Sequence, residues 1–167
     1  MTSDASVKIP SDPLRRIPVL NRQRQFRINR KAVALFCAEV LHSLKLPHPA
    51  LSVVFVRSRE MCSINSQYRG KDYATDVLSF AYEGVREDDM PFIGEILIAP
   101  EVAVRQAVRY GTAPEKEIRK LLVHGILHLL GYDHETDKGQ MNRIQARLVR
   151  RKFFLPAPLL VRSKVIG

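Results

Sequence analysis

The chain has 167 residues, of which 46% are hydrophobic, and its formal net charge is +10. This length suits one domain with a sizeable core and is too short to favour two domains. The sequence holds no apolar run of the roughly 20 residues that a membrane span needs and no signal-peptide pattern at its start, so we expect a cytoplasmic protein without a membrane partner. Cys37 and Cys62 lack CxxC spacing and are expected to be reduced packing residues.

Strand and helix patterns alternate from residue 17 onward. Runs rich in β-branched and apolar residues predict strands at 17–21, 51–58, 76–82 and 93–99. Apolar residues at helical spacing predict helices at 28–46, 58–70 and 101–110. Ser58 is expected to cap the second of these helices, and Gly70 is expected to end it.

A further helix is predicted to begin near Thr112, because Thr112 and Glu115 have the spacing of a capping box. Gly131 is positioned to end this helix after about 18 residues. Its apolar residues surround most of its circumference, so we expect it to be central and buried.

Together these elements predict an α+β fold, with a mixed sheet of about four strands packed with about five helices. We expect one domain at 15–155, between a flexible N-terminal tail at 1–14 and a C-terminal tail at 156–167. The prolines of PAPLL at 156–160 predict an irregular exit from the domain.

Positive charge is concentrated toward both ends of the chain. Residues 15–31 and residues 143–164 each carry seven Lys or Arg and no acid, whereas residues 83–90 carry four acids. Such a distribution favours a polyanionic partner, most often nucleic acid. The alternative is that these basic residues form only solvated faces.

The predicted central helix contains the motif HGILHLLGYDH at residues 124–134. His124 and His128 are four residues apart, so their Cβ atoms lie on one face at about 6 Å, close enough for both imidazoles to reach one ion. Gly131 can adopt a positive φ and turn the chain back, which brings His134 toward the other two. Three imidazoles with an open fourth position are typical of a catalytic zinc site. The alternative is three hydrogen-bonded histidines without a metal.

This spacing matches the H-E-x-x-H-x-x-G-x-x-H helix of metzincin peptidases at the three histidines and the glycine. Gly125 occupies the position of the glutamate that serves those peptidases as general base, so peptide hydrolysis by their usual route is disfavoured. A peptidase would need a base from elsewhere, such as Glu95 or Glu135. A phosphodiester substrate needs instead a cation near the phosphoryl oxygens, and Arg69 is a candidate for that contact or for a surface salt bridge.

The motif HGILHLLGYDH, together with NSQYRGKDYATDVLSF and GEILIAPE, resembles the YbeY family of bacterial rRNA maturation endoribonucleases from about residue 15 to 152. The resemblance implies a zincin-like fold that binds one zinc ion per chain. It implies single-strand-specific RNA cleavage, a role in maturing the 3′ end of 16S rRNA, and ribosome quality control. The implied partners are rRNA and the small ribosomal subunit, with a ribosomal protein or an assembly GTPase as further candidates.

Individual residues follow from the same resemblance. His124, His128 and His134 correspond to the metal ligands, and Arg69 corresponds to the active-site arginine. Family members often have proline at the positions of Ala74 and Ala81, which affects loop stiffness and no ligand.

Weaker candidates surround these residues. Asp133 either orients a ligand histidine or only stabilises the turn. Tyr68, Lys71 and Tyr73 are candidate RNA contacts, and Tyr68 has the alternative of a core position. Two rival functions stay open, a zinc peptidase with a non-standard base and a non-catalytic ribosome assembly factor with structural zinc.

Overall fold

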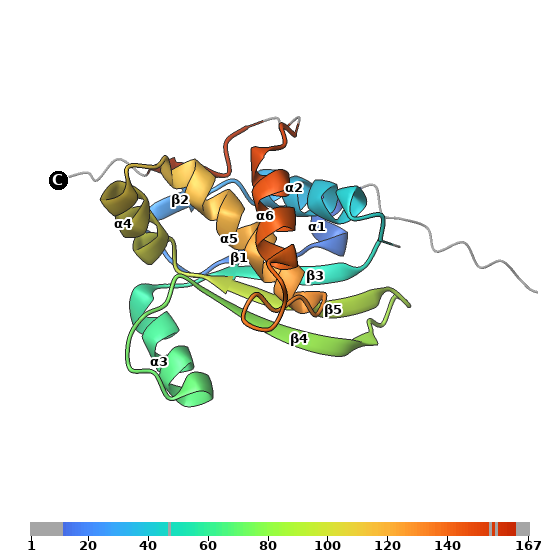
Figure 1. The fold of residues 1–167 in the computed structure, drawn as a ribbon, viewed down its shortest axis with the longest axis horizontal. Helices are drawn as coiled ribbons and strands as arrows, with labels where there is room; N and C mark the ends of the chain where they lie inside the picture. The colour runs from blue at the N-terminus through green and yellow to red at the C-terminus, as the bar shows by residue number, and fades with distance from the viewer. Residues whose placement is uncertain (1–11, 47, 154, 156, 163–167) are drawn as a thin grey trace, which may run out of the picture.

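The computed structural model describes residues 12–46, 48–153, 155 and 157–162 (Figure 1). In chain order the elements are α1 (Pro13–Arg16), β1 (Val19–Asn21), β2 (Phe26–Ile28), α2 (Arg30–Ser43), β3 (Ala50–Phe55), α3 (Ser58–Arg69), β4 (Val77–Val85), β5 (Pro91–Ile98), α4 (Pro100–Tyr110), α5 (Pro114–Leu129), α6 (Gln140–Arg150) and β6 (Leu160–Arg162). No helix of this described part is long and apolar enough to span a membrane.

The described strands form two sheets. The larger is four-stranded, in the order β1-β3-β5-β4, with β1, β3 and β5 parallel and β4 antiparallel to β5. The smaller pairs β2 with β6 in antiparallel register. The mixed four-stranded sheet and its helices confirm the predicted α+β class, and the second sheet adds a feature that no sequence pattern indicated.

Alternating side chains of β3 and β5 build two apolar clusters, one on each face of the larger sheet. Val53 and Ile96 belong to the main core beneath α2 and α5. Val54 and Leu97 point the other way and pack with Met61 of α3. Figure 1 accordingly shows α2 and α5 over one face and α3 beyond the other.

Helix α5 lies at the centre of the fold, as predicted, and contacts α2, α4, α6, β4 and β5. Most of its circumference is buried, including Leu122, Ile126 and Leu127. At Gly125 the helix approaches β5 so closely that an added Cβ would lie 2.9 Å from side-chain carbons of Ile96. The absence of a side chain at 125 therefore sets the distance between the helix and the sheet.

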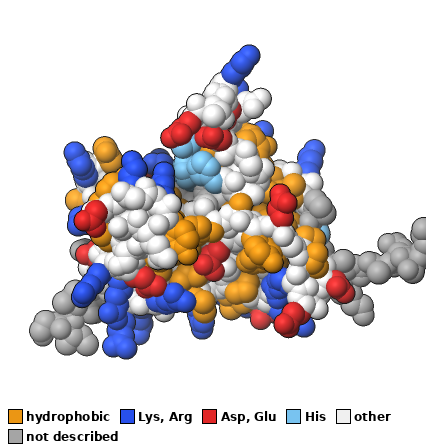
Figure 2. Space-filling view, turned by 90° about the horizontal axis from the view of Figure 1, so that it is seen from below, with side chains coloured by type: hydrophobic (Ala, Val, Ile, Leu, Met, Phe, Trp, Pro, Cys, Tyr) orange, Lys and Arg blue, Asp and Glu red, His pale blue; other side chains and the backbone are white. Residues whose placement is uncertain are grey.

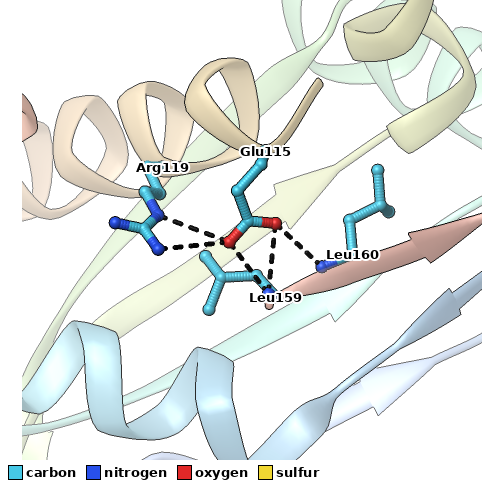
Figure 3. Close-up of polar contacts among 4 residues, drawn as sticks. All are labelled: Glu115, Arg119, Leu159 and Leu160. Atoms are coloured by element: carbon cyan, nitrogen blue, oxygen red, sulfur yellow. Dashed lines mark hydrogen bonds and ion pairs between the residues drawn. The ribbon is translucent and has the colours of Figure 1, made fainter. Parts of the chain in front are cut away.

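The expected capping box at the start of α5 is wrong. The residue before the helix is Ala113, without a side-chain cap, and the Oγ1 of Thr112 is buried with no hydrogen-bond partner. The carboxylate of Glu115 instead accepts hydrogen bonds from the backbone N–H groups of Leu159, at 2.9 and 3.1 Å, and Leu160, at 3.1 Å (Figure 3). Glu115 therefore binds backbone N–H groups from a distant part of the chain and not the neighbouring Thr112.

The same contact revises the expected irregular exit at 156–160. Leu159 is buried and residue 160 begins β6, so part of the predicted C-terminal tail is paired with β2. At the other end, α1 occupies the last residues of the predicted N-terminal tail. Residues 1–11, 156 and 163–167 lie outside the described residues, and the domain limits stay a prediction.

Two helix starts also differ from expectation. Ser58 is the first residue of α3 and its hydroxyl donates to Glu101 Oε2 at 2.6 Å, so it is not the cap. Helix α2 begins at residue 30 because Asn29 accepts a hydrogen bond from the backbone N–H of Ala32 at 3.0 Å, while residues 26–28 form β2.

Candidate metal centre

Three histidines converge at the end of α5. His124 and His128 lie on one face of the helix, with their Nε2 atoms 3.0 Å apart and their ring centroids 4.5 Å apart. The ring centroid of His134 is 5.6 Å from that of His124 and 5.5 Å from that of His128. One ligand atom from each residue lies within 4.8 Å of the others, so the three imidazoles can reach one ion.

A tight turn brings His134 back to the helix. Gly131 has a φ of +89°, a conformation that favours glycine, and its N–H donates to the carbonyl of His128 at 3.0 Å. Tyr132 N–H then donates to the carbonyl of Leu127 at 3.0 Å. The turn at the glycine is therefore the one that the sequence predicted.

Asp133 stabilises the loop after this turn. Its Oδ1 accepts from the backbone N–H of Glu135 at 2.9 Å, and its carbonyl accepts from those of Thr136 and Asp137. None of the hydrogen bonds among the described residues joins the Asp133 carboxylate to a histidine. These contacts fit the role of stabilising the turn and not the role of orienting a ligand histidine.

Asp137 ends the loop and starts α6. Its carboxylate accepts from the N–H of Met141 at 2.8 Å and from that of Gly139 at 2.7 Å. These backbone hydrogen bonds, that of Met141 foremost, lower the pKa of Asp137 below its ordinary value of 3.8.

Gln145 of α6 holds the other side of His124. The Oε1 of Gln145 lies 2.9 Å from Nδ1 of His124. Because an amide oxygen can only accept, this contact places the proton of a neutral imidazole on Nδ1 and leaves the lone pair on Nε2, the atom that faces His128. No sequence pattern indicates Gln145, because its position depends on how Met141 and Leu148 pack α6 against the core.

The surroundings favour neutral imidazoles. Burial lowers the pKa of His124 below its ordinary value of 6.5, and His128 and His134 lower it further, against a raising effect of the hydrogen bond with Gln145. Burial also lowers the pKa of His128, followed by the nearby His134. Neutral imidazole is the form that coordinates a metal.

His124 and His128 line a cavity of about 460 Å³. It is lined by Tyr68, Arg69, Val77, Leu78, Ser79, Phe80, Ala81, His124, His128 and Leu129. In Figure 2 histidine side chains form a pale-blue patch on the surface, with Lys and Arg side chains on one side of it and Asp or Glu side chains above it. The centre is therefore accessible to a ligand from outside.

Helix α3 delivers Arg69 and Tyr68 to this cavity. Arg69 is exposed, takes part in none of the ion pairs among the described residues, and lies near enough to His128 to lower its pKa. Tyr68 is 64% exposed and packs edge-on against Phe80, with ring centroids 5.2 Å apart, so the core alternative for Tyr68 is wrong.

The loop after α3 carries the remaining candidates. Asn65, which is buried, donates through Nδ2 to the carbonyl of Tyr73 at 2.9 Å and so holds the loop against α3. Lys71 and Tyr73 are exposed in this loop but do not line the cavity. The structure thus groups Arg69 and Tyr68 with the histidines and leaves the other two outside.

The donor set fits a zinc ion. Three imidazoles form the group, and within the described residues no fourth His, Cys, Asp or Glu completes it. This is the arrangement of a site that keeps one position for water or substrate.

Neither of the two carboxylates considered as the base of a peptidase lies at the metal centre. The position that a metzincin fills with glutamate is Gly125, which packs against Ile96 and has no room for a side chain. Glu95 accepts a hydrogen bond from the hydroxyl of Ser52 at 2.7 Å, and Glu135 is exposed in the loop beyond His134. Neither carboxylate lines the cavity.

Comparisons with known proteins agree on one family. The family model described as Endoribonuclease YbeY matches residues 18–152. Endoribonuclease YbeY of Thermodesulfovibrio yellowstonii is 36% identical over 143 residues, covering 77% of this chain and 90% of that protein. The Nautilia profundicola protein of the same name is 42% identical over 114 residues, covering 68% and 79%.

A solved structure is also similar. The solution structure of TM1509 from Thermotoga maritima matches with a TM-score of 0.57 and 28% identity, covering 80% of this chain and 86% of that one. The family model covers most of the chain and includes the three histidines, Arg69 and the strands between them. The chain belongs to the endoribonuclease YbeY family.

Proposed function

We propose that this protein is a zinc-dependent endoribonuclease that cuts single-stranded RNA, matures the 3′ end of 16S rRNA and takes part in ribosome quality control. The observation that carries the proposal is the three-histidine group, two of whose members, His124 and His128, line one cavity with Arg69. Similar proteins support the proposal, because the relatives from Thermodesulfovibrio yellowstonii and Nautilia profundicola are both named Endoribonuclease YbeY.

The histidines and Arg69 have separate roles in this proposal. His124, His128 and His134 hold the zinc ion, which when bound supplies a Lewis acid for a phosphoryl oxygen or a water of lowered pKa. Arg69 binds the phosphate, because its guanidinium forms no ion pair with a carboxylate of the described residues and its N–H groups match two phosphoryl oxygens. Positive charge at Arg69 also stabilises the charge that develops on the phosphoryl group during cleavage.

The shape and charge of the surface favour an unpaired strand. Tyr68 presents an exposed ring at the mouth of the cavity, where an unstacked base can pack against it. Lys71 and Tyr73 in the neighbouring exposed loop are further candidate contacts. The net charge of +10 favours an RNA partner. The family of the chain further favours rRNA in the small ribosomal subunit as that partner, with a ribosomal protein or an assembly GTPase as an additional one, and a cytoplasmic location.

The test compares cleavage of a single-stranded RNA that carries the 3′ end of small-subunit rRNA by zinc-loaded wild type, His128→Ala and Arg69→Glu. Arg105→Glu on α4 is the matched charge-reversal control, since Arg105 is exposed and outside the cavity. Zinc content is determined for every sample. We expect His128→Ala to lose zinc and cleavage together, and Arg69→Glu to keep zinc while its kcat/KM falls by about 10²-fold or more.

Cleavage by Arg105→Glu should equal that by wild type. Full cleavage by Arg69→Glu would contradict the role of the arginine. Hydrolysis of unstructured proteins by wild type, abolished in His128→Ala, would instead favour the peptidase.

A further inference from the structure

A second cavity borders the loop between His128 and His134 and has no part in the function described so far. It measures about 480 Å³ and is lined by Tyr132, Gln140, Arg143, Ile144 and Arg147. Four of these residues belong to α6, and the fifth lies in the loop that joins the second and third histidines. We call this cavity the α6 groove.

The α6 groove is positively charged. Arg143 and Arg147 are exposed and four residues apart, so they lie on one face of the helix, and Arg150 follows on the same face. The sequence of α6, QMNRIQARLVR, contains no acid. None of the ion pairs among the described residues involves these arginines, and Arg143 Nη1 donates only to the carbonyl of Lys138, at 3.1 Å.

The groove is held in a fixed place relative to the histidines. Met141 and Leu148 of α6 are buried in the core, and Gln145 between them contacts His124. Figure 1 shows α6 lying across α5, the helix that carries His124 and His128. Tyr132, which lines the groove, belongs to the loop between His128 and His134, so a ligand bound along the arginines meets the edge of that loop.

The groove lacks the features of an apolar docking site. Among the described residues, the exposed large hydrophobic side chains are Leu20, Tyr68, Tyr73, Tyr82, Val85, Val108, Tyr110 and Val161, and none of them lies on α6 or in the loop before it. A partner helix or a membrane surface would find little apolar area to bury there. The charge instead suits a polyanion.

We propose that the α6 groove binds the sugar–phosphate backbone of the RNA strand that enters the metal centre, on one side of the bond to be cut. The proposal rests on the proposed function, because it assigns the groove to the same substrate. Arg143 and Arg147 contact phosphates through their N–H groups, and Tyr132 packs against a ribose or base between the groove and the histidines. Such contacts set the position of the strand without reading its sequence.

The experiment measures binding of a fluorescently labelled single-stranded RNA by anisotropy at several salt concentrations. The proteins are wild type, Arg143→Ala/Arg147→Ala and the control Arg105→Ala/Arg109→Ala, whose arginines are also exposed and four residues apart on a helix. Each is also prepared with His128→Ala, so that cleavage does not interfere. Wild type, the α6 variant and the α4 control are also compared with His128 in place. Their zinc content and melting temperature show whether the metal centre and the fold are intact.

We expect the α6 variant to raise Kd about tenfold at low salt and to reduce the slope of log K against log[salt] by about 1.4, which is roughly 0.7 for each lost phosphate contact. The α4 control should keep the Kd and slope of wild type. In cleavage assays the α6 variant should raise KM with little change in kcat, because the groove holds the strand in the ground state and the transition state alike.

Equal Kd and slope for wild type and the α6 variant would overturn the proposal. Duplex RNA of the same length that competes as well as single-stranded RNA would also overturn it. If the α6 variant binds RNA normally but no longer binds small-subunit proteins, the groove is instead a protein-binding site. If the α6 variant loses RNA binding but wild type cuts no RNA, the groove stands and the proposed function fails. If wild type cuts the RNA but the α6 variant binds RNA as tightly as wild type does, the proposed function stands and the role of the α6 groove fails.

Discussion

His124 has a contact at each imidazole nitrogen. Nε2 faces His128, while Nδ1 meets Gln145 from a helix 21 residues farther along the chain. A metal-binding histidine needs an acceptor at its second nitrogen to fix its tautomer and ring orientation. Gln145 supplies that acceptor from α6.

Replacing Gln145 by leucine should weaken zinc binding about 10–100-fold, because His124 loses the acceptor that keeps Nε2 free for the metal. Zinc affinity is measured by competition with a chelator, and the tautomer of His124 by the ¹⁵N shifts of its ring. Gln145→Glu retains an acceptor and should bind zinc nearly as wild type does. Asn142→Leu, an exposed residue of the same helix, controls for added apolar surface.

Unchanged affinity and tautomer in Gln145→Leu would show that the contact is incidental.

Local chemistry explains which site residues the sequence could reveal. His124 and His128 are one helical turn apart, and the glycine turn that returns His134 lies within the same eleven residues. Gln145 could not be found in this way, because its contact depends on how two helices pack. Sequence alone leaves Arg69 as either a phosphate contact or a surface salt bridge, and only the family resemblance makes it the active-site arginine. Its place in the cavity depends on the packing of α3 beside β4.

At the scale of the elements, hydrogen bonds at helix ends decide how the C-terminal segment and the histidine loop are held. Glu115 was expected to form a cap with Thr112 but binds the backbone of Leu159 and Leu160, so it links α5 to the strand β6 (Figure 3). The capping pattern indicated a helix start near the right residue and assigned its glutamate the wrong partner. A local spacing pattern cannot reveal this partner, because the backbone N–H of Leu159 is 44 residues from Glu115 along the chain.

Glu115→Ala should lower the free energy of unfolding by about 1–3 kcal/mol, because two backbone N–H groups lose a charged acceptor. Equilibrium denaturation measures the loss, and hydrogen exchange should accelerate at the amides of Leu159 and Leu160. Thr112→Val is the control and should change stability little, since the Thr112 hydroxyl has no partner in the described structure.

A larger loss for Thr112→Val than for Glu115→Ala would restore the capping box.

Asp137 should make the stability of the histidine loop depend on pH. Its pKa is lowered from 3.8 by backbone hydrogen bonds, so the carboxylate stabilises the folded state above that pH and the contribution is lost as the pH falls through the lower folded pKa. Asp137→Asn should therefore unfold more easily than wild type at neutral pH. The difference should shrink in acid, where wild type also loses the charge.

Denaturant unfolding of both proteins across this range measures the difference. A gap that stays constant with pH would contradict the assignment of the stabilisation to the ionised carboxylate. Glu135→Gln, an exposed carboxylate in the same loop, should leave the pH profile of wild type unchanged.

At the scale of the whole molecule, the mixed sheet, the helices around it and the metal centre form one arrangement. The order of strand and helix patterns predicted the α+β class, since each pattern reports which faces of an element are buried. The strand order β1-β3-β5-β4 and the pairing of β2 with β6 were not predictable, because they depend on contacts between distant segments. No helix was predicted at the position of α6, although its residues contact His124 and line the α6 groove.

The central claim is that zinc held by the three histidines makes this chain a ribonuclease. Zinc is titrated into the metal-free protein while bound zinc and cleavage of the small-subunit rRNA 3′ end are followed together. We expect cleavage to rise in proportion to bound zinc and to level off at one ion per chain. Zinc-saturated protein that leaves this RNA intact, both alone and with ribosomal subunits present, would contradict the proposed function and favour an assembly factor with structural zinc.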